Sequence, residues 1–293
     1  MLSNELIRDE KSKDILSELK QLARKTKRSY SQKVYTQYFL ERFLYRLANS
    51  KYKDKFILRG STLLYILDFK NARMTGDIDF MGSGISNDKE NIINAFEEIT
   101  QISCDDDRVV FYPKTMKIKD IMFEKTYRGR RIYMQASIYD VRREIHFDLG
   151  YGDVITPEPK LRKYPIMFPD KMPAFNILTY TIETSIAEKI ATIIEKDGYN
   201  TRLKDFYDIW FVFNYIDYNE ETLRKAMKNT FKQRNIPFTT EVSAFDISFY
   251  LTEENIKIWK HFIESKNVPY KLTFYEIGLF ITTTVKNLVE SMK

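Results

Sequence analysis

The sequence of 293 residues is poor in the residues that build disulfides and soft metal sites. It contains one cysteine, Cys104, and two histidines, His146 and His261. A single cysteine excludes an internal disulfide, and these three residues are too few for the common zinc or iron–sulfur sites. Ser-His-Asp and Cys-His catalysis is disfavoured because only two residues could act as the base. Any metal in this protein is therefore expected to be held by oxygen atoms.

Long apolar runs are also missing. No hydrophobic stretch approaches the roughly 20 residues of a membrane-spanning helix. The first residues lead into charged, helix-like sequence instead of a signal peptide. We therefore expect a cytoplasmic protein with no membrane partner. The hydrophobic content of 43% is sufficient for a packed core in one large domain or two ordinary ones.

Positive charge exceeds negative charge only slightly. The sequence holds 47 Lys and Arg against 41 Asp and Glu, which gives a net charge of +6 and a pI of about 9.0. The two signs are largely interspersed, so the balance permits a nucleic-acid partner without proving one. Basic residues dominate two segments, 114–131 and 224–234. Such runs are most often solvated faces, and they support RNA binding only modestly.

The first half of the sequence predicts helices and strands mixed together. Apolar residues at three- and four-residue spacing indicate helices, and short β-branched or aromatic runs indicate strands. Helices are predicted over 7–22, 35–47, 63–69 and 88–102, and strands over 56–58, 77–80, 109–112, 131–136 and 145–149.

The second half of the sequence predicts helices alone. It follows a connecting stretch that is punctuated by five prolines between Pro157 and Pro173. The predicted helices cover 177–196, 202–216, 220–234, 253–266 and 274–292. We therefore predict an α+β fold, with a mixed β-sheet core and flanking helices in residues 1–170 and a helical C-terminal half in residues 171–293.

Two carboxylates stand two residues apart in the predicted strand Asp77-Ile78-Asp79-Phe80. Residues at this spacing share one face of a strand, so Ile78 and Phe80 would face the core. Two carboxylates this close repel unless one is protonated or a cation lies between them, and Mg²⁺ suits such a pair. An isolated pair of this kind is more often a solvated strand end, so its neighbours in the sequence decide between the two interpretations.

A possible phosphate cradle precedes this pair at Gly60-Ser61-Thr62. A strand, then Gly-Ser, then a helix presents backbone N–H groups and a hydroxyl at the positive end of the helix. The alternative is that Gly60 turns the chain and Ser61 caps the helix. The combination of Gly60-Ser61 with Asp77 and Asp79 resembles the signature of the nucleotidyltransferase superfamily, which includes DNA polymerase β.

That superfamily generally takes a third carboxylate from a later strand to complete a two-metal site. Asp148, in Phe147-Asp148-Leu149-Gly150, is the best-placed candidate for this third ligand. Asp140 and Asp153 are the alternatives, and Asp153 could serve only to shape the turn.

A lysine interrupts an apolar helix stripe in the second half. Lys189 lies between Ile186 and Ile193 on the stripe, where a lysine must reach solvent, pair with an acid or face a pocket. Asp205 and Asp208, three residues apart on the next helix, share a face. A structural ion pair that joins the two helices is at least as plausible on physical grounds as catalysis.

Five linked segments resemble the AbiEii/AbiGii family of nucleotidyltransferase-like toxins, which belong to bacterial abortive-infection and type IV toxin–antitoxin systems. The resemblance covers about residues 55–215. Its segments are Leu58-Arg59-Gly60-Ser61-Thr62, Asp77-Ile78-Asp79-Phe80, Phe147 to Asp153, Glu183 to Lys189 and Arg202 to Asp208. The sequence departs from the family in having Ser61 where many relatives have glycine and in having 15 residues between Ser61 and Asp77.

The resemblance implies a site that the helical half completes. Asp77, Asp79 and Asp148 would hold Mg²⁺, or Mn²⁺ in its place, and Gly60, Ser61 and Thr62 would bind the nucleotide phosphates. The family's later motifs assign Lys189 to the triphosphate. They also assign Asp205, or Asp208 if the alignment is shifted, as the acid that positions Lys189 or the acceptor.

The resemblance also implies an activity and partners. It predicts an enzyme that transfers NMP from an NTP, GTP or CTP, with the tRNA 3′ acceptor end as the preferred acceptor and a cognate antitoxin encoded nearby. Two alternatives stay open. One is transfer to a protein or a small molecule, and the other is a growth inhibitor that binds GTP or RNA without transfer.

Overall fold

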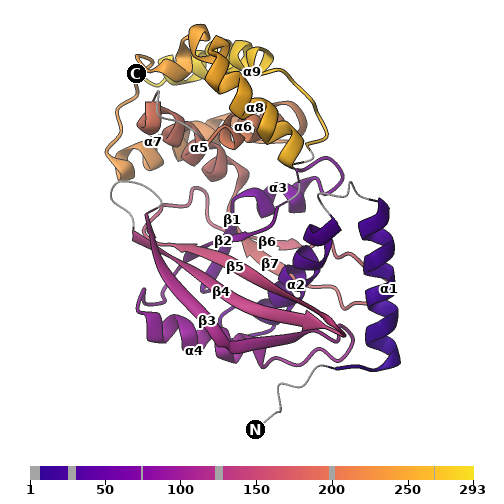
Figure 1. The fold of residues 1–293 in the computed structure, drawn as a ribbon. Coiled ribbons are helices and arrows are strands. Elements are labelled where there is room, and N and C mark those ends of the chain that lie inside the picture. Colours follow the sequence, from indigo (N-terminus) through magenta and orange to yellow (C-terminus); the bar gives the residue numbers. More distant parts are fainter. Residues whose placement is uncertain (1–6, 26–30, 74, 123–127, 198–201, 267) are drawn as a thin grey trace. The chain divides into compact units, whose positions relative to one another are not determined.

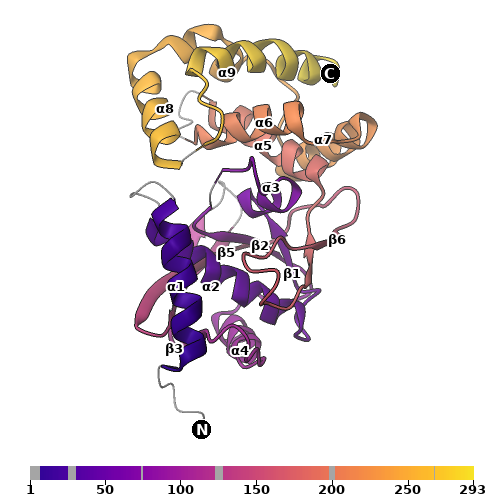
Figure 2. The ribbon, with the colours of Figure 1, turned by 90° about the vertical axis from the view of Figure 1, so that its right-hand side faces the viewer.

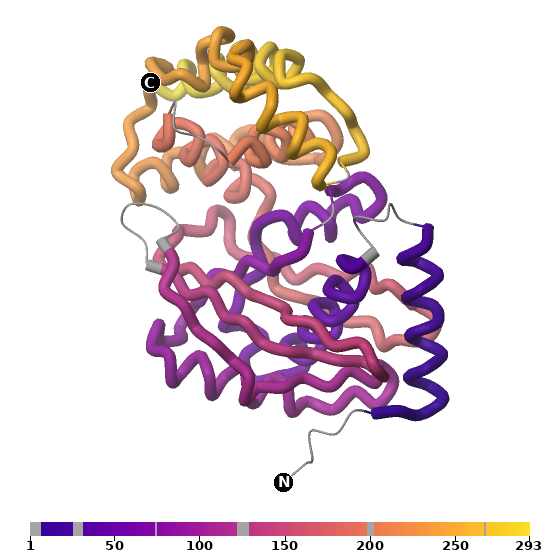
Figure 3. Tube along the Cα trace, viewed as in Figure 1, coloured from indigo at the N-terminus to yellow at the C-terminus, as the bar shows by residue number. Residues whose placement is uncertain are grey.

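The computed structural model describes residues 7–25, 31–73, 75–122, 128–197, 202–266 and 268–293. The chain divides into two compact units. The first comprises 1–62, 75–152 and 161–179, and the second comprises 63–74, 153–160 and 180–293. The sequence predicts one boundary between residues 170 and 171, whereas each of these units contains segments from both sides of that position. Figure 3 follows the chain from β1 through α3 and back to β2.

The first unit is built on a seven-stranded mixed sheet with the order β3-β4-β5-β2-β1-β7-β6. The strands are β1 (Phe56–Arg59), β2 (Ile78–Gly82), β3 (Val110–Met122), β4 (Arg128–Ile138), β5 (Val141–Gly150), β6 (Lys160–Lys163) and β7 (Asn176–Thr179). Strand β2 is antiparallel to β1 and parallel to β5, and β3, β4 and β5 form an antiparallel meander. Figure 1 shows the long arrows of this meander side by side. Strand β2 is therefore an interior strand, paired on both edges.

Two helices cover one face of this sheet, and a third, α1 (Glu10–Lys25), packs against the first of them. The two are α2 (Ser31–Ala48) and α4 (Lys89–Thr100), and Figure 2 shows them near each other. An aromatic cluster joins them to the strands. The centre of the Phe147 ring on β5 lies 4.4 Å from the centre of the Phe43 ring of α2 and 5.2 Å from that of the Phe96 ring of α4. Because Ile78 and Phe80 of β2 are also buried on this side, the alternation of the strand places Asp79 on the opposite face.

The second unit is helical. Its helices are α3 (Ser61–Leu67, which begins in the first unit), α5 (Ile182–Lys196), α6 (Lys204–Tyr215), α7 (Glu220–Arg234), α8 (Glu253–Lys266), α9 (Phe274–Phe280) and α10 (Lys286–Glu290). Two 3₁₀ turns, Ser243–Phe245 and Ile247–Leu251, precede α8. A buried cluster of aliphatic and aromatic side chains from these elements forms the core, and it includes Ile186, Phe206, Met227, Trp259 and Phe274.

The α+β prediction is confirmed, but residues 177–179 belong to strand β7 and not to a helix. Strand β6 lies inside the connecting stretch with the five prolines, where no strand was predicted. The C-terminal helix predicted over 274–292 is present as consecutive helical segments, and its middle segment, Ile281–Val285, is π-helical. In the part of the chain that the structure describes, no helix has the length and apolar character needed to cross a bilayer.

Replacing Phe147 with alanine should destabilise the first unit by about 3–5 kcal/mol, because it leaves a cavity among Phe43, Phe96 and Phe80. The single cysteine, Cys104, lies in this unit and is partly buried, so urea-dependent thiol labelling reports on the unit's unfolding.

The control variant is Leu161→Ala on strand β6. This side chain is 67% exposed, and its loss should change stability by less than about 0.5 kcal/mol. Equal effects of the two variants would contradict the packing described for Phe147.

Candidate functional site

Asp77 and Asp79 lie at the start of strand β2. Asp77 immediately precedes the strand, and Asp79 is its second residue. Both are partly exposed, whereas Ile78 and Phe80 are buried. The predicted arrangement, with two carboxylates on one face and two apolar side chains on the other, is therefore present. The side chain of Asp77 is 33% exposed, and its Oδ2 lies 3.9 Å from Nε2 of His146 on β5.

Gly60 lies directly against Asp79. It joins β1 to α3 with a φ of +69°, in the left-handed region that favours glycine. A Cβ atom at this position would lie 2.2 Å from Oδ2 and 2.9 Å from Cγ of Asp79. Glycine is therefore needed here for two reasons, its backbone conformation and the space that the Asp79 carboxylate occupies.

A chain of hydroxyl groups connects Ser61 to Asp77. The buried Ser61 hydroxyl donates to Oγ1 of Thr75 at 2.7 Å, and Thr75 Oγ1 donates to Oδ1 of Asp77 at 2.9 Å. The Thr62 hydroxyl donates weakly to the backbone oxygen of Asp77 at 3.4 Å. Sequence reasoning assigned Ser61 and Thr62 to a nucleotide. That assignment stays a prediction. In the structure the Ser61 hydroxyl, through Thr75, and the Thr62 hydroxyl hold the segment that carries Asp77, and Thr75 is a residue that this reasoning missed.

Asp148 is aligned with Asp79 across the parallel strands β2 and β5. Its two carboxylate oxygens accept hydrogen bonds from Nε and Nη2 of Arg131, both at 2.6 Å. These hydrogen bonds hold the pKa of the Arg131 guanidinium above its usual range. The prediction that Asp148 binds metal stays a prediction, and in this structure its carboxylate is engaged by Arg131.

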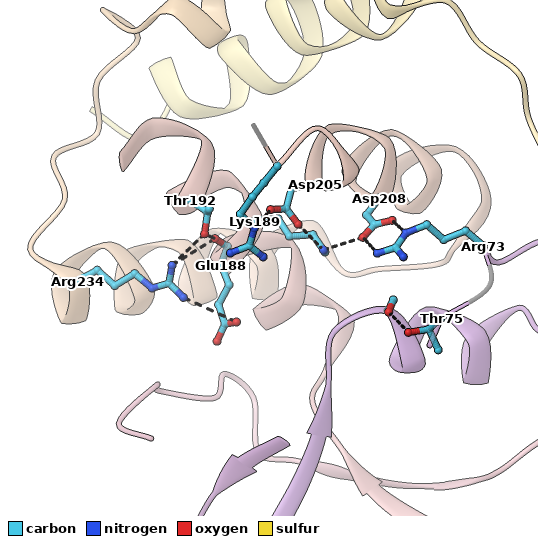
Figure 4. Close-up of polar contacts among 10 residues, drawn as sticks. Arg73, Thr75, Glu188, Lys189, Thr192, Asp205, Asp208 and Arg234 are labelled. Atoms are coloured by element: carbon cyan, nitrogen blue, oxygen red, sulfur yellow. Dashed lines mark hydrogen bonds and ion pairs between the residues drawn. The ribbon is translucent and has the colours of Figure 1, made fainter. Parts of the chain in front are cut away.

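The two alternative carboxylates have different surroundings. Asp140 is exposed in the turn between β4 and β5. Asp153 belongs to the second unit, where its Oδ1 lies 3.6 Å from Nη2 of Arg234. The side chain of Arg234 is largely buried and also contacts Glu188 and Thr192 (Figure 4). Among the three candidates, Asp148 is the one that is aligned with Asp79.

The chemistry of Asp77 and Asp79 fits magnesium. Carboxylate oxygens are the donors that Mg²⁺ prefers, and proteins commonly hold it by one or two carboxylates together with waters and substrate phosphates. Within the described ranges, no group of three or more His, Cys, Asp or Glu side chains is arranged to hold a metal ion. The pair therefore fits an ion that substrate phosphates help to hold.

Lys189 lies in a buried ion network of the second unit. Its Nζ on α5 is 3.0 Å from Asp205 Oδ1 and 2.9 Å from Asp208 Oδ2, both on α6. Arg73, in the segment after α3, donates to both oxygens of Asp208 at 2.8 and 2.9 Å. Figure 4 shows Lys189 between the two aspartates, with Arg73 on the other side of Asp208. The ion pair that joins α5 and α6 is therefore present, and it involves both acids.

Burial and neighbouring charges shift the pKa values in this network in opposite directions. Burial acts to raise the pKa values of Asp205 and Asp208, but nearby cations outweigh it, and both pKa values lie below the ordinary range. Burial also acts to lower the pKa of Lys189, but the two aspartates outweigh it and raise this pKa. All three groups are therefore charged near neutral pH, although their side chains are at most 12% exposed.

Arg73 is the residue of this network that sequence reasoning missed. It lies 135 positions before its partner Asp208, in the segment between two motifs, and nothing in its local sequence marks it. Of the two basic segments, 114–131 lies on β3 and β4, and 224–234 lies on α7. Residues 123–127 of the first segment, with Lys125 among them, lie outside the described residues.

Replacing Arg73 with methionine should destabilise the second unit by up to about 3–5 kcal/mol, because it removes one of the two cations beside the fully buried carboxylate of Asp208 and leaves only Lys189. Both tryptophans of the chain, Trp210 and Trp259, lie in this unit. Their fluorescence during urea unfolding therefore measures this change.

Arg202 provides a matched control. It pairs with Asp205 at 3.1 Å but is 39% exposed, so Arg202→Met should cost no more than about 1 kcal/mol. A small effect of Arg73→Met would show that the network contributes little to the stability of this unit.

Comparison with known proteins places the chain in a family. A family model described as "Nucleotidyl transferase AbiEii toxin, Type IV TA system" matches residues 42–269, which is most of the chain. None of the curated proteins matches. The five motifs from Leu58 to Asp208 fall inside the matched range, and the family that they predict is confirmed.

Solved structures that are similar in fold include MenT4 and JHP933. MenT4, a nucleotidyltransferase toxin from Mycobacterium tuberculosis H37Rv, has a TM-score of 0.57 and 11% identity over 94% of this chain and 93% of that chain. JHP933 from Helicobacter pylori has a TM-score of 0.51 and 15% identity over 89% of this chain and 93% of that chain. At these identities the similarity concerns the fold, whereas the family model identifies the chain. The protein belongs to the AbiEii family of nucleotidyl transferase toxins of type IV toxin–antitoxin systems.

Proposed function

We propose that this toxin transfers a nucleoside monophosphate from an NTP, GTP or CTP, to the 3′ acceptor end of tRNA, and that the reaction depends on Mg²⁺. The observation that carries the proposal is the pair Asp77 and Asp79 on an interior strand, with Gly60 against the second carboxylate. Family membership supports the reaction class and implies a cognate antitoxin. The proposed role in the cell is abortive infection, in which the toxin stops growth in response to phage.

The proposed reaction is a displacement at the α-phosphorus. An acceptor hydroxyl oxygen bonds to this atom, the bond from the α-phosphorus to the β-bridging oxygen breaks, and pyrophosphate leaves while the hydroxyl proton is released. Asp77 and Asp79 are the residues that would hold the ion, and the bound ion would help to orient the triphosphate for in-line attack. The hydroxyl chain from Ser61 through Thr75 keeps Asp77 in place. A magnesium or manganese ion would neutralise charge on the phosphates.

The second unit contributes a separate proposal. Following the family motifs, we assign Lys189 to the negative charge of the triphosphate and Asp205 to the orientation of Lys189. The contact of 3.0 Å between Lys189 Nζ and Asp205 Oδ1 supports this orienting role. Asp208 holds Lys189 equally closely and is itself held by Arg73. Both acids therefore position the lysine, which suits a fixed point charge.

Labelled NTPs test the acceptor. The purified toxin is incubated with each NTP and Mg²⁺ in the presence of total tRNA or of cell lysate. Label in tRNA supports the proposal. Label in protein or in small molecules, or binding of GTP without any transfer, would overturn the choice of acceptor and support the corresponding alternative.

Asp79→Asn should reduce nucleotide transfer by at least about 100-fold, because it removes a negative charge that would hold the ion against the phosphates. Cells that express the variant should grow like cells without the toxin. Asp170→Asn, at an exposed position, is the control and should retain full transfer and toxicity. Full toxicity of a soluble Asp79→Asn variant would exclude the proposed site.

Gly60→Ala should lower transfer by on the order of 100-fold, because the new Cβ would displace the Asp79 carboxylate. Gly76→Ala is a matched control, since a Cβ at Gly76 would meet no atom within 4 Å. Initial transfer rates of the two variants provide the comparison. Similar rates for both would show that the position of Asp79 does not limit the reaction.

A further inference from the structure

The face of the sheet that carries Asp79 also carries a line of basic and aromatic side chains. Across β3, β4 and β5, Lys117 is aligned with Tyr133 and Tyr133 with His146. The next row on the same face aligns Lys119 with Arg131, Arg131 with Asp148, and Asp148 with Asp79. We call Lys117, Lys119, Tyr133 and His146 the aromatic–basic stripe.

Contacts run along the stripe toward Asp77. Nζ of Lys119 lies 5.3 Å from the centre of the Tyr133 ring, and the rings of Tyr133 and His146 are 5.9 Å apart. His146 Nε2 in turn lies 3.9 Å from Asp77 Oδ2. The line crosses three strand spacings, from β3 to β2, which amounts to about 14 Å. It therefore ends at a carboxylate of the proposed catalytic pair.

These side chains are accessible. Lys117 and Lys119 are exposed, and Tyr133 and His146 are partly exposed, whereas Ile132, Met134 and Phe147 on the other face of the same strands are buried. The aromatic rings are thus outside the apolar core. A cross-strand ring pair alone would stabilise the sheet slightly. It would not require two exposed lysines beside it, or a line that leads to Asp77.

We propose that the aromatic–basic stripe binds the unpaired 3′ end of the RNA acceptor and guides its terminal hydroxyl to Asp77 and Asp79. Exposed aromatic rings stack on bases of single-stranded RNA, and lysines beside them contact the phosphates. The positive charge of Lys117 and Lys119 complements that backbone. A base stacks on Tyr133 and His146, and the strand continues toward β2. This inference rests on the proposed function, since it identifies how the same site receives its acceptor.

Variants of Tyr133 test whether its ring binds RNA by stacking or only stabilises the sheet. In the full-length protein without NTP, Tyr133→Leu should weaken binding of a short single-stranded RNA by about 5- to 100-fold, whereas Tyr133→Phe should bind like the unmodified protein. Fluorescence anisotropy of an end-labelled RNA measures this. In transfer assays, Tyr133→Leu should raise the KM for RNA and leave the KM for NTP unchanged.

Tyr52 provides a matched control in the same unit. Lys51 Nζ lies 5.2 Å from the centre of its ring, so this lysine–tyrosine pair repeats the contact of Lys119 with Tyr133 away from the stripe. Tyr52→Leu should leave RNA binding unchanged. Should Tyr133→Leu fail to fold, Lys117→Ala with Lys119→Ala replaces it. This double variant should reduce the slope of log K against log salt by about 0.7 for each lysine.

The outcomes separate the two proposals. Suppose that the unmodified protein labels RNA and that the folded Tyr133→Leu variant binds RNA and transfers nucleotide equally well. The proposed role of the stripe is then wrong, and the proposed function stands. Stronger binding of a blunt RNA duplex than of the single strand would also overturn the stripe. If label enters protein instead of RNA while Tyr133→Leu still weakens RNA binding, the proposed acceptor is wrong and the stripe stands as an RNA-binding surface.

Discussion

The two-residue period of strand β2 is the constraint on which the candidate site depends. Ile78 and Phe80 are buried against the sheet's aromatic core, so the pleat commits Asp77 and Asp79 to the other face. A shift of the strand by one residue would bury two carboxylates and expose two apolar side chains. The hydrophobic energy that holds the core together therefore also holds the carboxylates in register with Asp148 and beside Gly60.

The second unit shows a different use of burial. Lys189, Asp205, Asp208 and Arg73 are ions in a place where isolated ions would be very unfavourable. Each acid contacts at least two cations, because Arg202 adds a contact to Asp205. Such a network holds α5, α6 and the segment after α3 in one arrangement. The geometry of the network is specific, because Asp208 lies between Arg73 and Lys189, and Asp205 lies between Lys189 and Arg202.

Strong local patterns made part of this structure predictable. Residue spacing alone predicts that Asp77 and Asp79 share one face of a strand. It also predicts helix α7, Glu220–Arg234. Strand β7 was missed because a short apolar run such as Asn176–Thr179 reads equally well as the start of the helix that follows. Arg73 and Thr75 were missed for another reason. Their roles depend on partners that folding brings close, and the residues next to them in the sequence do not indicate these roles.

The interior position of β2 has a consequence for motion. Its backbone is hydrogen-bonded to β1 on one edge and to β5 on the other, so it cannot move without opening two ladders at once. The side chain of Asp79 can rotate within nanoseconds, but its backbone is paired on both edges of β2, and Asp77 directly precedes this strand. When a nucleotide binds, the backbone of β2 is therefore expected to stay in place. The side-chain rotamers, the bound ions and the nucleotide itself adjust instead.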